Sequence, residues 1–305
     1  MRKIIYDIDQ PLELTRFLMA LTLNLNSSGR CDANALFLAT ACDLAYYPQD
    51  QGRAEFAAKL GLNANLISVD NTQCYVGEND SAVVLAFRGS ETPNSLDGFK
   101  DWLLTNAKNF LVLPAGRLGT DFVAAGVGAR FHSGFVESLE EIWPPLFKAV
   151  EAVLAKKDRP LFVTGHSLGG ALALLAAWRL QRNMIPVQAV YTFGAPMVGN
   201  DVTAKAFEKE FPNRIFRYVD SGDMVPALPT VSMFSNEYWH CLTEVVVGGT
   251  APASESIKAL ASGSPDASMS QAVMDGVWTK ATSGIQRHLM GNYITQINSL
   301  NGKSS

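Results

Sequence analysis

Residues 165–169 read Gly-His-Ser-Leu-Gly, the pattern Gly-x-Ser-x-Gly. The pattern follows the apolar run 161–164, typical of a buried strand, and precedes the Ala/Leu-rich run 167–181, typical of a buried helix. A serine in a sharp turn between strand and helix exposes its hydroxyl above the helix N-terminus. The context therefore predicts a nucleophile elbow at Ser167. The alternative, a phosphate-binding loop, is disfavoured because such a loop needs Gly-Lys-Ser/Thr.

A serine hydroxyl reacts at neutral pH only beside a general base, which an acid must orient. In the chain order that accompanies such an elbow, the acid follows the serine and the histidine comes last. That order leaves His240 and His288 as bases, and His288 is favoured because it follows all the predicted strands. Asp220 and Asp223 both follow the predicted strand 215–219, and Asp223 is favoured because Asp220 is suited to capping the turn between them. From the residues alone, both choices stay open.

Acyl transfer also needs donors for the developing oxyanion. The elbow supplies one, the backbone N–H of Leu168. The loop after an early strand is expected to supply the second, and Ser90 follows the apolar run 82–87 at such a place. Ser90 offers both its N–H and its hydroxyl.

These groups require a sheet whose strands end at one edge. Short apolar strands that alternate with helices predict the α/β class, a mostly parallel sheet with helices on both faces. No internal repeat or long linker divides the chain, so we expect one domain over 1–305. Helices are expected at 32–47, 134–157 (with a kink or restart at the prolines 144–145), 167–181 and 201–210. Strands are expected at 161–164, 187–193, 215–219 and 242–247, with two more in 66–88 around a turn at 78–80. The Ala/Ser-rich stretch 248–283 is expected to form helices over the site.

Composition limits the classes of function. The chain has 305 residues, 48% hydrophobic and 18% charged, and a formal charge of −4, which fits a large folded core. It has no Lys/Arg-rich run that would predict a nucleic-acid surface. No stretch of about 18 apolar residues predicts a membrane span. Acidic residues and the lack of a cleavage site near the N-terminus argue against a signal peptide, so we expect a cytoplasmic protein or export without a cleavable signal.

The four cysteines are expected to be free, buried thiols. Cys31 and Cys42 would lie about 16 Å apart along one helix, too far for a disulfide. A Cys74–Cys241 disulfide stays open. The four histidines share no close spacing with one another or with cysteine, so neither a metal site nor a cofactor is expected.

Several short motifs occur in a fixed order along the chain. They are Ala-Phe-Arg-Gly-Ser (86–90), Asp-Trp (101–102), His-Ser-Gly-Phe (132–135), Thr-Gly-His-Ser-Leu-Gly-Gly (164–170), Thr-Phe-Gly-Ala-Pro (192–196), Val-Gly-Asn (198–200), Asp-Met-Val-Pro (223–226) and Tyr-Trp-His (238–240) with Glu244. Taken together, these motifs resemble the class 3 lipase family of α/β hydrolases, which includes the fungal triacylglycerol lipases. The resemblance runs from about residue 30 to 295, in the family's order. Two departures are Met197 where the family usually has Arg, and Leu242 where Gly is usual.

The resemblance implies an α/β-hydrolase fold with Ser167 as nucleophile, Asp223 as acid and His288 as base, and with Ser90 and Leu168 as oxyanion donors. It also implies that His240 is structural and that residues 91–106 form a lid.

The expected function is hydrolysis of triacylglycerol or related lipid esters at an oil–water or membrane interface, with no obligatory protein partner. The alternatives are a phospholipase A1, an esterase of short-chain or aromatic acids and, more remotely, an inactive binding scaffold.

Overall fold

The computed structural model describes residues 21–90, 111–112, 121–223, 225–227, 238–249 and 286–301. The expected lid over 91–106 and all but the first two residues of 248–283 lie outside the described residues. The described helices are α2 (Asp32–Leu44), α3 (Gln49–Leu60), α6 (Ser133–Leu154), α7 (Leu168–Arg182), α8 (Asp201–Glu210), η1 (Val225–Ala227) and α11 (Met290–Asn301). The described strands are β1 (Asn63–Val69), β2 (Thr72–Glu78), β3 (Val83–Phe87), β4 (Leu111–Val112), β5 (Phe131–His132), β6 (Leu161–His166), β7 (Val187–Phe193), β8 (Gly199–Asn200), β9 (Ile215–Asp220), β10 (Tyr238–Trp239) and β11 (Thr243–Val247).

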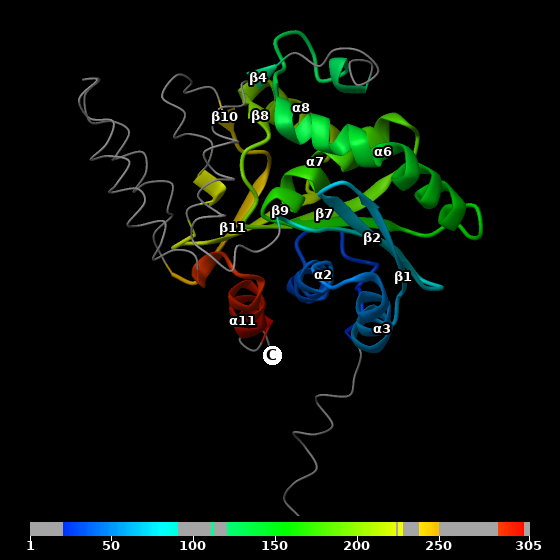
Figure 1. The fold of residues 1–305 in the computed structure, drawn as a ribbon. Coiled ribbons are helices and arrows are strands. Elements are labelled where there is room, and N and C mark those ends of the chain that lie inside the picture. The colour runs from blue at the N-terminus through cyan, green and yellow to red at the C-terminus, as the bar shows by residue number, and fades with distance from the viewer. Residues whose placement is uncertain are drawn as a thin grey trace, which may run out of the picture.

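The main sheet of the described residues has the order β1-β2-β3-β6-β7-β9-β11. Its strands run parallel from β3 to β11, while β1 and β2 add an antiparallel edge. Every residue of β3 and β6 is buried, as expected of central parallel strands covered on both faces. A smaller sheet, β10-β8-β5-β4, lies beside α8 (Figure 1). The prediction of a mostly parallel α/β sheet is confirmed.

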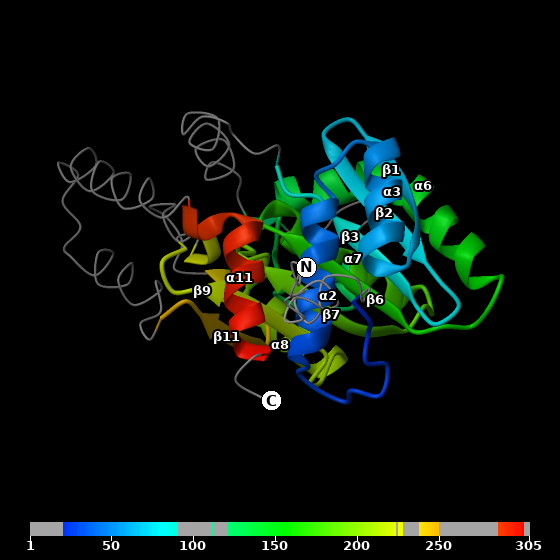
Figure 2. The same ribbon diagram turned by 90° about the horizontal axis from the view of Figure 1, so that it is seen from below.

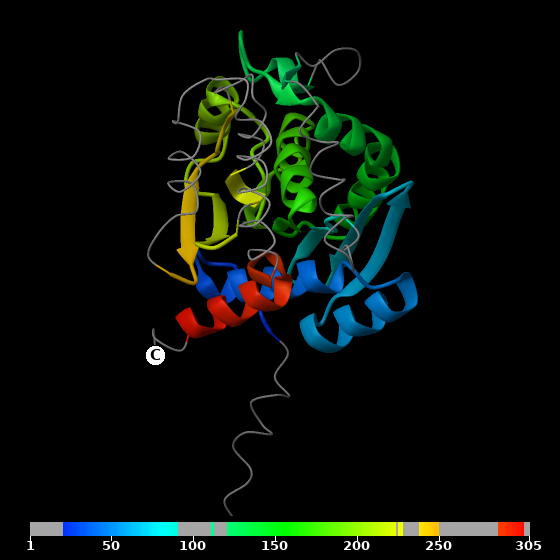
Figure 3. The ribbon, with the colours of Figure 1, turned by 60° about the vertical axis from the view of Figure 1, so that its left-hand side comes forward.

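Helices cover both faces of the main sheet. One face carries α6, α7 and α8, and the other carries α2, α3 and α11 (Figures 1 and 3). On the second face α11 lies against α2, although the two helices come from opposite ends of the chain (Figure 2). In the part of the chain that the structure describes, no helix combines the length and apolar character needed to cross a membrane.

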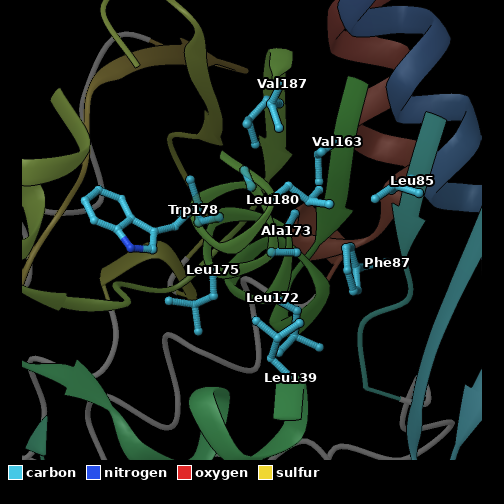
Figure 4. Close-up of a cluster of buried hydrophobic side chains, with 14 of the residues drawn as sticks. Leu85, Phe87, Leu139, Val163, Leu172, Ala173, Leu175, Trp178, Leu180 and Val187 are labelled. Atoms are coloured by element: carbon cyan, nitrogen blue, oxygen red, sulfur yellow. The ribbon is translucent and has the colours of Figure 1, made fainter. Parts of the chain in front are cut away.

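The core has one cluster on each face of the sheet. On the α6–α7 face, Leu172 of α7 lies beside Leu139 of α6, whereas Trp178 points away from them (Figure 4), and its ring centroid lies 4.9 Å from that of Phe207 on α8. Every α7 residue from Gly169 to Leu180 is buried. A helix that is apolar all round is stable only inside a core, so the Ala/Leu-rich composition of α7 explains its central position.

Two details differ from the sequence-based expectation. Residues 66–88 were expected to hold two strands, but β1, β2 and β3 occupy 63–87 because Asp70, at a φ of 47°, makes an additional hairpin turn. Pro144 and Pro145 were expected to kink or restart a helix, and α6 continues through both without a restart. Both prolines are exposed, so the carbonyls that lose their helical donors lie toward solvent.

The four cysteines are free thiols, which answers the open question of a Cys74–Cys241 disulfide. Cys42, Cys74 and Cys241 are buried, whereas Cys31 is only partly so. Burial raises the pKa of the Cys241 thiol to about 12, and that of the Cys74 thiol also rises. Because the thiolate is the reactive form, neither thiol is suited to act as a nucleophile.

Candidate active site

Ser167 stands between the last residue of β6 and the first residue of α7, as the elbow requires. Its φ of 54° and ψ of −129° lie in a region that L-residues rarely adopt. The turn is fixed by two backbone hydrogen bonds, from Ser167 N–H to Phe193 O and from Gly170 N–H to Ser167 O, both 2.9 Å. The predicted strand–serine–helix turn is present.

The small residues around the serine are required by space. A Cβ at position 165 would overlap the carbonyl of Gly169, and one at 169 would overlap the carbonyl of Phe87 on β3. A Cβ on Gly170 would lie 2.6 Å from Cβ of Ala195. These glycines therefore allow β6, α7 and the end of β3 to meet closely at Ser167.

Asp223 and His288 meet beside this turn. His288 Nδ1 lies 2.8 Å from Asp223 Oδ2, and both side chains are buried. Asp223 follows β9, and its Oδ1 accepts the backbone N–H of Val225 at 2.9 Å. His288 precedes α11. The carboxylate accepts the Nδ1 proton, which leaves Nε2 as the basic nitrogen of the neutral imidazole.

Gly194 connects the pair to the elbow. The residue before it, Phe193, accepts the backbone hydrogen bond of Ser167. A Cβ on Gly194 would lie 2.7 Å from Asp223 Oδ2 and 3.0 Å from His288 Nδ1, and its φ is +59°. Only glycine allows the end of β7 to approach both side chains this closely.

Tyr293 is a site residue that the sequence analysis missed. Its hydroxyl donates to Asp223 Oδ2 at 2.6 Å and accepts the backbone N–H of Asp220 at 3.1 Å. Burial, together with the charge of Asp223, raises the pKa of Tyr293 well above its ordinary value, so the hydroxyl keeps its proton and remains a donor. The only sequence signal was its place five residues beyond His288.

Asp220 and His240, the alternatives that the sequence left open for the acid and the base, are not part of the Asp223–His288 pair. Asp220 accepts from Arg287 Nη1 at 3.2 Å, from Asn292 Nδ2 at 2.9 Å and from the N–H of Gly222 at 2.8 Å. It thus caps the turn and ties down the residues around the base. His240 lies between β10 and β11, and it is His288 that the structure pairs with an aspartate.

The two predicted oxyanion donors flank the elbow. Leu168 is the first residue of α7, so its N–H belongs to the unsatisfied donors of a helix N-terminus. Ser90 follows β3, whose Phe87 is the register partner of Gly165. A Cβ on Gly89 would lie 3.2 Å from Ser167 Cβ, and among the described residues none bonds the buried Oγ of Ser90. The loop before Ser90 therefore packs against the nucleophile.

Within the described ranges, no group of three His, Cys, Asp or Glu side chains is arranged to hold a metal ion. The chemistry offered is that of a buried serine beside a histidine–aspartate pair. A backbone N–H at a helix N-terminus is available to a developing negative charge.

The chain is similar in sequence and fold to known lipases. The family model for lipase (class 3) matches residues 84–233. The chain is 38% identical, over 188 residues, to secreted mono- and diacylglycerol lipase 1 of Fusarium solani, an alignment that covers 59% of this chain and 48% of the relative. It is 32% identical over 164 residues to the chloroplastic phospholipase A(1) DAD1 of Arabidopsis thaliana, covering 51% and 35%.

A crystal structure of the MDLA protein of Penicillium cyclopium superposes with a TM-score of 0.58 at 26% identity, covering 71% of this chain and 80% of that one. The chain spans about half the length, or less, of these two curated relatives. The matched segment runs from β3 through the turn at Ser167 to beyond Asp223, in the order expected from the motifs. The chain belongs to the class 3 lipase family, on the α/β-hydrolase fold.

Proposed function

We propose that the chain is a serine carboxylic ester hydrolase that cleaves acyl esters of lipids through an acyl-enzyme at Ser167. The observation that carries the proposal is the buried 2.8 Å contact between His288 Nδ1 and Asp223 Oδ2 beside the strained serine turn. A histidine bound in this way has a fixed tautomer in which Nε2 carries the lone pair, which is what a general base for a serine requires.

In the acylation step, Ser167 Oγ attacks the ester carbonyl carbon while His288 Nε2 takes the hydroxyl proton. The carbonyl oxygen becomes an oxyanion, which accepts hydrogen bonds from the N–H of Leu168 and from Ser90. The C–O bond to the alcohol then breaks as His288 returns the proton to the leaving alkoxide oxygen. The product is an acyl ester on Ser167 and a free alcohol.

Deacylation repeats the sequence with water. His288 takes a proton from the water as its oxygen attacks the acyl carbon, and then protonates Ser167 Oγ as the carboxylic acid leaves. Asp223 stays ionised throughout and stabilises the imidazolium through the Nδ1 hydrogen bond. Its other oxygen is held by the N–H of Val225, so it keeps its orientation during both steps.

For the substrate, we propose partial acylglycerols, presented at an oil–water or membrane interface. This rests on relatives whose names specify mono- and diacylglycerol lipases. A second candidate, phospholipase A1 activity, is favoured by the Arabidopsis thaliana relative of that name. Both use the same acyl transfer at Ser167 and differ only in the alcohol that leaves.

The test measures fatty-acid release by pH-stat from mono-, di- and trioleoylglycerol emulsions and from phosphatidylcholine vesicles, with Ser167→Ala as the matched control. A fluorophosphonate should add one label to the wild type and none to the variant. Preference for phosphatidylcholine would select the second candidate, and activity on soluble short-chain esters alone would indicate a plain esterase. A wild type that neither hydrolyses any ester nor takes the label would refute the proposal and leave a binding scaffold.

A further inference from the structure

His166, the residue before the nucleophile, is buried between the catalytic base and a tyrosine. Its Nε2 lies 2.7 Å from the main-chain oxygen of His288, and its Nδ1 lies 2.7 Å from the hydroxyl of Tyr46. Its ring centroid lies 4.6 Å from that of His288, with 36° between the planes. Neither His166 nor Tyr46 has a role in the acyl transfer described above.

The chemistry of the partners fixes every proton in this contact. A carbonyl oxygen can only accept, so Nε2 of His166 carries a hydrogen and donates to His288 O. Burial, and then repulsion from the positive charge that His288 carries when protonated, lowers the pKa of His166, which keeps its ring neutral and leaves a lone pair on Nδ1. Tyr46 donates its hydroxyl proton to that lone pair, since burial raises the pKa of Tyr46 and keeps it protonated.

The carbonyl that His166 binds lies just before α11, which begins at Met290. In a regular helix the N–H of Asn292 would bond the carbonyl of His288. Here it bonds the carbonyl of Leu289 instead, at 3.0 Å. The main chain of His288 is therefore held by a side chain from the elbow, 122 residues earlier in the sequence.

The same tyrosine reaches the other side of the site. A Cβ on Gly89 would lie 2.3 Å from Tyr46 Oη, so the hydroxyl packs against the backbone of the residue before the expected oxyanion donor Ser90. Hydrogen bonds thus connect Tyr46 through His166 to the main chain of the general base, and a close packing contact connects Tyr46 to the loop of Ser90.

We propose that His166 is a positioning residue, which holds the main chain of His288 so that its imidazole stays aligned between Asp223 and Ser167. This inference rests on the proposed ester hydrolysis at Ser167. Asp223 fixes the ring at Nδ1, and His166 fixes the backbone that carries the ring. A displacement of about 1 Å at a reacting group costs on the order of 10²-fold in rate, which is the effect at stake.

Two substitutions separate the hydrogen bond from the ring. His166→Phe keeps an aromatic ring and the packing but donates nothing, whereas His166→Gln keeps an N–H for the carbonyl and an oxygen for Tyr46. His132, which is also buried and lies on β5 stacked on Phe135, provides the matched control His132→Phe. For all three variants, kcat and KM are measured with p-nitrophenyl butyrate in solution, and the melting temperatures are recorded.

We expect His166→Phe to lower kcat by roughly 10²-fold with KM within twofold of wild type. His166→Gln should recover most of that loss, and His132→Phe should keep wild-type kcat. Turnover of His166→Phe within threefold of wild type, or equal losses in the Phe and Gln variants, would overturn the proposal. If His166→Phe does not fold, Tyr46→Phe replaces it and should lower kcat at unchanged KM, with unchanged kcat as the opposing result. A wild type without activity on any ester would instead refute the proposed function.

Discussion

Ser167→Gly is expected to abolish hydrolysis and at the same time to stabilise the folded chain relative to Ser167→Ala. Both variants lack the hydroxyl, so they lose the same interactions of that group. They differ in backbone preference, because the φ of 54° and ψ of −129° at position 167 are strained for alanine and readily adopted by glycine. The comparison therefore isolates the strain at the nucleophile.

The magnitude follows from two opposing contributions. A residue held in a sparsely populated backbone region costs on the order of 1–3 kcal/mol. Glycine loses more conformational entropy on folding than alanine, and this loss reduces its gain in stability by roughly 0.5–1 kcal/mol. The net gain for glycine is about 0.5–2 kcal/mol. With an unfolding entropy of about 2.1 cal/mol/K per residue over 305 residues, this shifts Tm by roughly 1–3 °C.

The assay is urea unfolding and calorimetry of wild type, Ser167→Ala and Ser167→Gly at one pH, with ester hydrolysis measured on the same samples. Turnover should fall on the order of 10⁶-fold in both variants. The strain argument is refuted if Ser167→Gly is equal to or less stable than Ser167→Ala. Residual activity near wild type in either variant would refute Ser167 as the nucleophile.

Three further predictions concern the surrounding groups. Asp223→Asn should lower kcat by about 10⁴-fold because an amide no longer fixes the histidine tautomer, whereas Asp220→Asn should mainly lower Tm. Steady-state kinetics and melting curves of the two variants test this, and the reverse ranking would exchange the roles of the two aspartates. His288→Ala should be nearly inactive in the same assay, and His240→Ala should lose stability rather than turnover; an inactive but folded His240→Ala would contradict the assignment. Burial lowers the pKa of His166 in the folded chain, so below about pH 6.5 the unfolded chain binds a proton that the folded chain does not bind. The free energy of unfolding therefore keeps its full value above that pH and declines by up to about 1.4 kcal/mol per pH unit below it. Urea unfolding between pH 5 and 8 should show a flatter dependence for His166→Gln, and an identical slope would contradict this.

The elbow and the central strands could be predicted because their signals are local. The expected strand 187–193 and helix 201–210 coincide with β7 and α8. The turn at Ser167 depends on Gly165, Gly169 and Gly170, so the six consecutive residues 165–170 contain most of its sequence determinants. Long apolar runs with helical or strand spacing could be assigned to helices or strands without any information on the tertiary structure.

The sequence did not predict the positions at which a residue other than glycine adopts a positive φ. Asp70 turns the β1–β2 hairpin at a φ of 47° without a neighbouring glycine, so the turn signal was weak and one strand was missed. Leu242 stands where the family usually has glycine, and the structure has a φ of 59° there. Leu242 packs against the core cluster of the α6–α7 face, which offsets part of the strain. In both cases the backbone conformation is set by the surrounding fold.

The choice between Asp220 and Asp223 depends on α11. Both aspartates lie at the carboxyl end of β9, three residues apart, and the sequence gives each a plausible role. In the structure two consecutive residues of α11 bind different aspartates. Asn292 donates a side-chain N–H to Asp220, and Tyr293 donates its hydroxyl proton to Asp223. Consecutive helical residues point about 100° apart, so the rotation of α11 about its axis determines which carboxylate receives which donor. That rotation is set by the packing of α11 on α2 and the sheet, and no local pattern around residue 220 carries it.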